Sequence, residues 1–206
     1  MTLRSSEFPS NLRIGLLGGS FNPAHAGHRA IAEVALKQLG LHRVVWLVSP
    51  QNPLKAQNGM ADFEARYASA RALANHPRMT VSAFEEREGT RYTVDTIRRL
   101  KQRHPQTHFV FLIGADNLIQ LPRWQGWTDI FETVPIAVFA RPGWTFAPLF
   151  AKAAQRYARA RRPLTAARGL ALSHAPAWVF VPYTRRYESG TAIRLRGDWV
   201  GANLPS

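Results

Sequence analysis

Two histidines stand in the stretch of this chain whose residue types are best suited to chemistry, GGSFNPAHAGH at residues 18–28. An imidazole can donate a hydrogen bond to a phosphate oxygen, and residues three apart share a face once a helix has begun. The adjacent Gly18 and Gly19 permit backbone conformations that other residues avoid, and they let a ligand approach closely. The stretch is therefore predicted to bind phosphate through His25 and His28. The alternative is a solvated turn with two surface histidines.

A second candidate anion site lies near the end of the chain, in the sequence SGTAIR at residues 189–194. Ser189 and Thr191 stand at the predicted start of a short helix, and Arg194 follows one turn later. A helix start, hydroxyl groups and a guanidinium group can together donate hydrogen bonds to one anion. Taken alone, the pattern is explained equally well by a capped helix.

Two further candidates follow the most apolar predicted strand, residues 108–113. Asp116 comes two residues after Gly114, and its carboxylate can accept hydrogen bonds from ribose hydroxyls; the alternative is a helix N-cap. Trp124 offers a flat indole face on which a heteroaromatic ring can stack, with a cation–π gain for a pyridinium ring. The alternative for Trp124 is a core residue.

Alternating strands and helices must position these side chains. Short apolar runs predict strands at residues 14–17, 43–48, 79–84, 108–113, 135–139 and 178–181. Helical spacing predicts helices at 28–36, 63–75, 93–103 (with Thr93 as its cap), 127–132 and roughly 148–161, and another from Thr191 onward. Together they predict an α/β fold, a doubly wound, mostly parallel sheet with helices on both faces. Because ligands bind at the carboxyl ends of such strands, one rim is expected to hold residues 18–28, 49–55, 88–93, 114–127 and 141–143.

The composition is that of a globular protein with a strong positive charge. Its 206 residues, 46% of them apolar, predict a single domain at 13–206 after an N-terminal extension at 1–12. Cysteine is absent, no apolar run approaches the ~20 residues that span a bilayer, and the N-terminus lacks an apolar signal segment. We therefore expect a cytoplasmic protein without a membrane partner.

The charge balance predicts anionic partners. The chain has 27 Lys and Arg against 13 Asp and Glu, for a net charge of +14. The arginine-rich residues 156–162 lack the interleaved aromatics of single-strand binders, so we interpret them as a solvated helix face. Specific nucleic-acid binding is not expected.

Taken together, the two anion-binding stretches resemble the nucleotide-binding motifs of the adenylyl- and cytidylyltransferase superfamily. The second motif departs from the usual pattern, because Glu188 stands where Ile is usual and Gly190 replaces a Ser. Four shorter patterns occur in the order RYT, GADNL, WxxW and ARPG, at residues 91–93, 114–118, 124–127 and 140–143. In this order they resemble the bacterial nicotinate-nucleotide adenylyltransferases.

The resemblance implies a Rossmann-like nucleotidyltransferase fold and a role for each matching residue. ATP would be bound by Gly18, Gly19, Ser20, His25, Gly27, His28, Gly114, Asp116, Ser189, Thr191 and Arg194. The mononucleotide would be bound by Asn52, Lys55, Thr93, Trp124 and Arg141. Thr93 and the backbone after Trp124 would receive the nicotinate carboxylate, Trp124 would stack on the pyridine ring, and Arg141 would serve the phosphate. The residues implied in catalysis are His28, His25 and Arg194.

The reaction that the resemblance implies is adenylyl transfer from ATP to nicotinate mononucleotide, which yields deamido-NAD and pyrophosphate. The transfer would be a direct in-line displacement without a covalent intermediate, and Mg²⁺ would arrive with ATP rather than in a protein metal site. Close alternatives are the same reaction on nicotinamide mononucleotide or phosphopantetheine. Alternatives of another class are an RNA-binding protein and a non-catalytic nucleotide sensor. The sequence does not indicate the oligomeric state.

Overall fold

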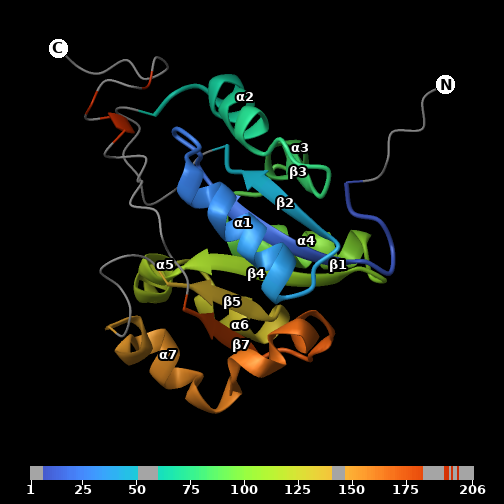
Figure 1. Ribbon diagram of the computed structural model, residues 1–206, viewed down its shortest axis with the longest axis vertical. Helices are drawn as coiled ribbons and strands as arrows, with labels where there is room; N and C mark the ends of the chain where they lie inside the picture. Colours follow the sequence, from blue (N-terminus) through green and yellow to red (C-terminus); the bar gives the residue numbers. More distant parts are fainter. Residues whose placement is uncertain are drawn as a thin grey trace.

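The structure, a computed structural model, describes residues 7–50, 60–140, 147–182, 193–194, 196 and 199. These residues contain one sheet of seven parallel strands in the order β3-β2-β1-β4-β5-β7-β6 (Figure 1). The strands are β1 (Arg13–Gly19), β2 (Arg43–Val48), β3 (Met79–Ser82), β4 (His108–Gly114), β5 (Ile136–Phe139), β6 (Arg161–Arg162) and β7 (Trp178–Val181). The central strands are almost wholly buried, as expected where helices cover both faces of a parallel sheet.

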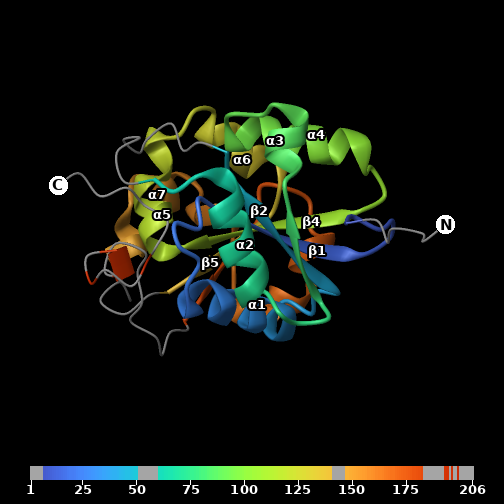
Figure 2. The same ribbon diagram turned by 90° about the horizontal axis from the view of Figure 1, so that it is seen from above.

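Helices cover both faces of the sheet and create two hydrophobic cores (Figure 2). One core lies under α1 (Ala26–Gln38), α2 (Phe63–Leu73) and the 3₁₀ helix η4 (Leu164–Leu172). The other lies under α4 (Thr93–Arg103), α5 (Ala115–Gln120), α6 (Trp127–Thr133) and α7 (Lys152–Arg156). Because side chains alternate along a strand, β4 sends Phe111 into the second core and its neighbours Val110 and Leu112 into the first.

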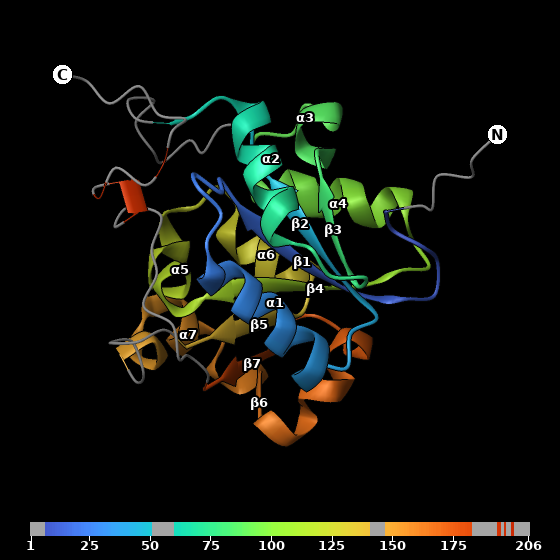
Figure 3. The same cartoon turned by 45° about the horizontal axis from the view of Figure 1, so that its top comes forward.

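The order of the strands reverses between β1 and β4. On one side of β1 lies β2, and β3 pairs with the far side of β2. The next strand in the chain, β4, pairs with the opposite side of β1, and β5 pairs with β4. In Figure 3, α1 and α2 lie near each other in front of the sheet. Such a reversal places a ligand-binding crevice outside the carboxyl ends of the two strands, here β1 and β4. The predicted doubly wound α/β fold is confirmed.

The predicted strand at residues 79–84 is shorter in the structure. β3 ends at Ser82, and a short helix that was not predicted, α3 (Phe84–Glu88), follows. The Ser82 hydroxyl oxygen accepts the Phe84 N–H at 3.2 Å, which stabilises the turn out of the strand. The predicted cap at Thr93 was also wrong, because α4 begins at Thr93 and its N-cap is Tyr92.

The predicted helix at residues 148–161 was wrong. The chain instead forms η2 (Ala147–Phe150), α7, η3 (Ala158–Ala160) and β6, so the arginines at 156–162 do not share one helix face. Tyr157 accounts for the break, because its ring stacks on Phe131 at 4.1 Å and its hydroxyl donates to Glu132 at 2.8 Å. The Tyr157 carbonyl also accepts the Trp178 Nε1–H at 2.8 Å. Tertiary contacts of Tyr157 thus override the local preference for a helix. The structure also contains two elements that the sequence analysis did not predict, β6 and η4.

The described residues before β1 pack onto the sheet. Phe8 is buried beside Phe84 and Phe109, and Glu7 accepts hydrogen bonds from Ser82 and Arg87. The start of the domain at residue 13 stays a prediction. Among the described residues, no helix is both long and apolar enough to cross a membrane.

Candidate active site

The two histidines of the first motif lie where β1 leads into α1. β1 ends at Gly19, and α1 begins at Ala26 with His25 as its N-cap in extended conformation (φ −145°, ψ 165°). His28 Nδ1 accepts the His25 backbone N–H at 3.2 Å, and the two ring centroids are 3.8 Å apart. A neutral imidazole that accepts at Nδ1 carries its proton on Nε2, so this contact leaves His28 Nε2 as a donor. The structure thus places a histidine with a protonated Nε2 beside a helix N-terminus, a position that favours an anion.

Buried aromatic rings pack against His28 of this loop. Phe21 is 1% exposed, and its ring lies 4.9 Å from the His28 ring and 5.2 Å from the Trp46 ring. A Cβ on Gly19 would lie 3.3 Å from the Phe21 ring. Gly18 and Gly19 belong to β1 without left-handed backbone, so the unusual conformations that they permit are not used, whereas the close approach of a ligand stays a prediction. Gly19 instead leaves room for Phe21, whose own backbone is left-handed (φ 47°).

The structure brings Arg194 to the first motif. The Arg194 guanidinium donates to the backbone carbonyl of Asn22, which lies three residues before His25. The Asn22 side-chain oxygen accepts hydrogen bonds from Trp199 Nε1 at 3.0 Å and from the Ala61 N–H at 3.1 Å. Residues far apart in the chain therefore meet at the loop between β1 and α1. This meeting places the second motif's cation beside Asn22 of the first motif.

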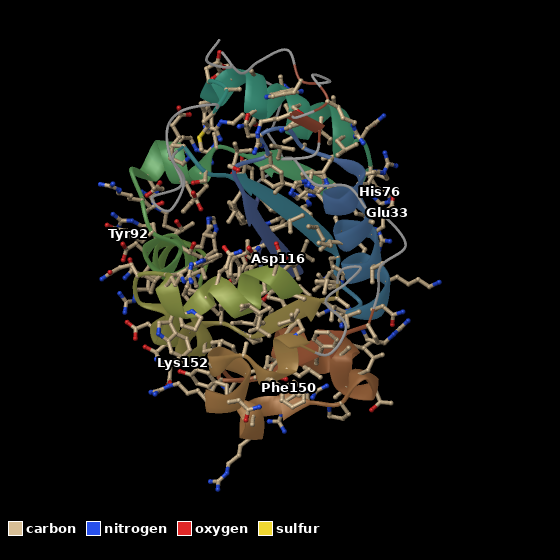
Figure 4. The ribbon with its side chains drawn as sticks, turned by 90° about the vertical axis from the view of Figure 1, so that its left-hand side faces the viewer. Glu33, His76, Tyr92, Asp116, Phe150 and Lys152 are labelled. Carbon is tan, nitrogen blue, oxygen red and sulfur yellow. The ribbon has the colours of Figure 1, made fainter. Side chains whose placement is uncertain are left out.

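Gly114 and Asp116 lie at the carboxyl end of β4, the strand that pairs with β1. Gly114 is both the last residue of β4 and the N-cap of α5, so the alternative that Asp116 caps this helix is wrong. Asp116 is half-buried in the first turn of α5. Figure 4 looks at this edge of the molecule and shows Asp116 near its centre, with Tyr92 toward one margin and Glu33 toward the other. Asp116 thus lies just beyond the carboxyl end of β4, where open α/β sheets bind ligands.

Thr93 and Trp124 belong to segments that pack against each other. Thr93 is the first residue of α4, and the turn from Trp124 to Trp127 contacts the same end of that helix. Gly126 in this turn has left-handed backbone (φ 62°), and a Cβ there would lie 3.0 Å from Val94 Cγ1. The Trp124 ring is half-buried and contacts Phe111 edge-on at 6.4 Å, which leaves part of the ring surface exposed. Trp127 instead packs on Tyr157 at 6.1 Å.

Five of the predicted site residues lie outside the described part of the chain. They are Asn52, Lys55, Arg141, Ser189 and Thr191. The described candidates come from the ends of β1 and β4, from the start of α4, from the turn before α6 and from Arg194. A groove of about 530 Å³ at the β6–β7 edge, lined by Arg161, Arg162 and Phe180 among others, contains no predicted site residue.

Two buried charged residues at this end of the sheet were missed by the sequence analysis. Arg66 in α2 is 1% exposed, and burial lowers the pKa of its guanidinium, an effect that the charges of Asp62 and Glu86 oppose. Burial raises the pKa of Glu85 to about 7, although hydrogen bonds from Ser49 and Thr96 act in the opposite direction. A signal existed for Arg66, because it lies four residues before the buried Ala70, on the apolar face of the helix.

The comparisons with known proteins agree with this geometry. Residues 16–196 match the family described as Cytidylyltransferase-like. A probable nicotinate-nucleotide adenylyltransferase of Parvibaculum lavamentivorans is 53% identical over 91% of this chain and 94% of that protein. The chain belongs to the nicotinate-nucleotide adenylyltransferase family. A second member of the family, from Roseobacter denitrificans, is 49% identical over 91% of this chain and 94% of its own.

Solved structures show the same fold at much lower sequence identity. Plasmodium falciparum nicotinic acid mononucleotide adenylyltransferase complexed with NaAD has a TM-score of 0.69 and is 14% identical. That match covers 89% of this chain and 83% of the other. At this identity the likeness supports the fold alone, and it agrees with the sheet order and the two helical layers described above.

Proposed function

We propose that this protein transfers the adenylyl group of ATP to nicotinate mononucleotide, with deamido-NAD and pyrophosphate as the products. The observation that carries the proposal is the contact of Arg194 with the Asn22 carbonyl, which joins the two phosphate-binding motifs at one crevice. The names of the relatives at about 50% identity support the choice of a nicotinate nucleotide as acceptor. We assign the activity to one domain at residues 13–206, preceded by an extension at 1–12. A cytoplasmic location is part of the proposal, since ATP is the substrate.

The chemistry needs no nucleophile from the protein. A phosphate oxygen of the mononucleotide attacks the α-phosphorus of ATP, a new P–O bond forms in line, and the bond to the β-phosphate oxygen breaks as pyrophosphate leaves. Catalysis then consists of aligning two anions and stabilising charge on the transferred group. His28 Nε2 donates to the α-phosphoryl oxygens, and the positive N-terminal end of the α1 dipole adds to this stabilisation. Arg194 neutralises charge on the departing pyrophosphate, and His25 helps to bind the triphosphate.

The remaining predicted residues complete the two substrate sites. For ATP, Gly18, Gly19, Ser20 and Gly27 would line the phosphate loop, Gly114 and Asp116 would hold the ribose, and Ser189 and Thr191 would add phosphate donors. For the mononucleotide, Thr93 would receive the carboxylate and Trp124 would stack on the pyridine ring, with Asn52, Lys55 and Arg141 as further contacts. These roles rest on the resemblance and on the positions of the described residues at one edge of the sheet.

Magnesium is part of the proposal as a component of the substrate MgATP. In the described part of the chain, no three His, Asp or Glu side chains gather closely enough to hold a metal ion. ATP phosphates supply oxygen ligands of the kind that Mg²⁺ prefers, so the ion would be delivered with the nucleotide.

The test is a comparison of acceptors. The purified protein is mixed with MgATP and with nicotinate mononucleotide, nicotinamide mononucleotide or phosphopantetheine, and pyrophosphate release and the dinucleotide product are measured. A site whose buried N–H donors pair with a carboxylate leaves them poorly matched to an amide. We expect a preference for the nicotinate compound of at least about tenfold in kcat/KM, equivalent to ~1.4 kcal/mol. Equal turnover of the two pyridine mononucleotides refutes the assignment.

A further inference from the structure

Arg66 connects three segments at the carboxyl edge of the sheet. Its Nε donates to the Ala61 carbonyl at 2.9 Å, and its Nη1 donates to the carbonyls of Ser20 at 2.8 Å and Ser49 at 2.7 Å. Its Nη2 donates to the Pro50 carbonyl at 2.9 Å. Four of the five N–H donors of one guanidinium are thus used, all on backbone oxygens.

The acceptors lie at the edge where nucleotide binding is proposed. Ser20 directly follows β1 and opens the loop that ends in His25, whereas Ser49 and Pro50 directly follow β2. The two strand ends also contact each other, because the Ser49 N–H donates to the Gly19 carbonyl at 3.0 Å. Arg66 therefore anchors the first residue of the proposed ATP loop to the neighbouring strand and to the segment before α2.

The guanidinium of Arg66 lies in the field of Asp62 and Glu86, both in the described part of the chain, but forms no ion pair with either carboxylate. Among the ion pairs of the described residues, none involves Arg66. Burying a cation without an ion pair is costly, and an apolar side chain of similar volume would avoid that cost. What the guanidinium provides instead is a rigid, planar fork of donors whose directions match several carbonyls at once. A lysine keeps the charge, but its three donors radiate from one atom and cannot reproduce that fork.

We propose that Arg66 is a positioning residue for the ATP-binding loop, which it holds through the Ser20 carbonyl in register with the end of β2. The inference rests on the proposed function, because it assigns Arg66 to the triphosphate side of that site. Thr93 and Trp124, the described residues on the mononucleotide side, lie on segments that Arg66 does not contact. Arg66 also holds the carbonyls of Ser49 and Pro50, which precede the proposed mononucleotide residues Asn52 and Lys55. Because the Ser20 carbonyl is held directly, whereas Asn52 and Lys55 lie two or more residues beyond Pro50, we expect the loss of the fork to affect ATP more than the mononucleotide.

The experiment compares Arg66→Lys with Arg71→Lys. Arg71 lies on the same helix and is exposed, so it serves as the matched control for the loss of a guanidinium from α2. Steady-state kinetics give KM for ATP and for nicotinate mononucleotide, and the melting temperature is recorded with and without α,β-methylene-ATP. For Arg66→Lys we expect KM for ATP to rise roughly tenfold or more, and KM for the mononucleotide at saturating ATP to change less than about threefold. The stabilisation by the ATP analogue should shrink in parallel, and Arg71→Lys should match the wild type.

The outcomes separate this inference from the proposed function. An active wild type with Arg66→Lys unchanged in KM for ATP overturns the inference alone, even if the variant melts earlier. Equal increases in both KM values also overturn it, because they indicate a general loosening of the fold. If neither Arg66→Lys nor Arg66→Gln folds, Arg66 is required for the fold itself and the positioning role is wrong. A wild type that forms no dinucleotide overturns the proposed function, and this inference with it.

Discussion

The contact between the two histidines of the first motif allows the roles of His28 to be separated by substitution. Nδ1 of His28 accepts the His25 backbone N–H at 3.2 Å, whereas Nε2 is assigned to the phosphate. An asparagine places a carbonyl oxygen near the position of Nδ1 but nothing at Nε2. A glutamine places an amide nitrogen near Nε2 but loses the acceptor at Nδ1. His28→Asn thus keeps the acceptor at Nδ1, and His28→Gln keeps the donor at Nε2.

The expected magnitudes follow from these contacts. One preorganised donor to the transferred group contributes ~2.7–4 kcal/mol, so its loss in His28→Asn should lower kcat by about 10²–10³. The His28 side chain supplies one half of a capping box at the start of α1, a hydrogen bond that contributes about 0.5–1.5 kcal/mol to stability and that Asn retains and Gln loses. His28→Gln should therefore be the less stable variant but the faster one. His28→Ala should show both losses, along with the edge contact to Phe21 at 4.9 Å.

The assay is single-turnover formation of the dinucleotide together with urea unfolding of each variant. Intact-mass measurement during turnover should find no adenylylated protein, because the mononucleotide phosphate attacks ATP directly. The reasoning fails if His28→Asn reacts at a nearly wild-type rate, or if His28→Gln is as slow as His28→Asn. An adenylyl group trapped on any side chain would overturn the direct displacement.

Three more outcomes are expected. Trp124→Ala should weaken mononucleotide binding by ~1–3 kcal/mol in calorimetric titration and leave ATP binding largely intact; a variant that does not fold would show that Trp124 is a core residue. Arg194→Ala should lower kcat as well as ATP affinity, because charge grows on the leaving pyrophosphate, and an unchanged kcat would limit Arg194 to ground-state binding. Burial raises the folded-state pKa of Glu85 to about 7, above its ordinary value of 4.5, so the folded protein binds the extra proton between these pH values. The free energy of unfolding should therefore fall as pH rises from about 4.5 to 7 and then level off, and Glu85→Gln should remove this slope in urea titrations.

Sequence patterns were sufficient to predict the layout of the fold and the main candidates of the site. Continuous apolar runs predict parallel strands because both faces of such a sheet are buried, and residues 108–113 indeed form all of β4 except its last residue. The histidines of the first motif were found because a turn that binds phosphate needs particular residue types at short spacing. Arg194 was singled out through the resemblance; the structure shows it beside Asn22, and its role toward ATP stays a prediction.

Other features depended on contacts between residues distant in the chain. Tyr157 leaves the predicted helix because Phe131 offers a flat partner from another helix, and no local preference encodes that contact. The Nδ1 contact of His28 depends on where the backbone of His25 turns, which only the folded loop defines.

Arg66 is the clearest case of what only the tertiary structure decided. In the sequence it is an arginine on a helix, and arginines on helices are mostly exposed. It becomes a buried junction because the carbonyl groups of Ser20 and Ser49, which follow two neighbouring parallel strands, both accept hydrogen bonds from its guanidinium. Such oxygens must be paired once they are buried, and the fork of donors that pairs them can come from a distant element. Local sequence therefore determines which hydrogen-bond donors and acceptors are available. The way in which the strand ends come together at the edge of the sheet determines which of these groups meet.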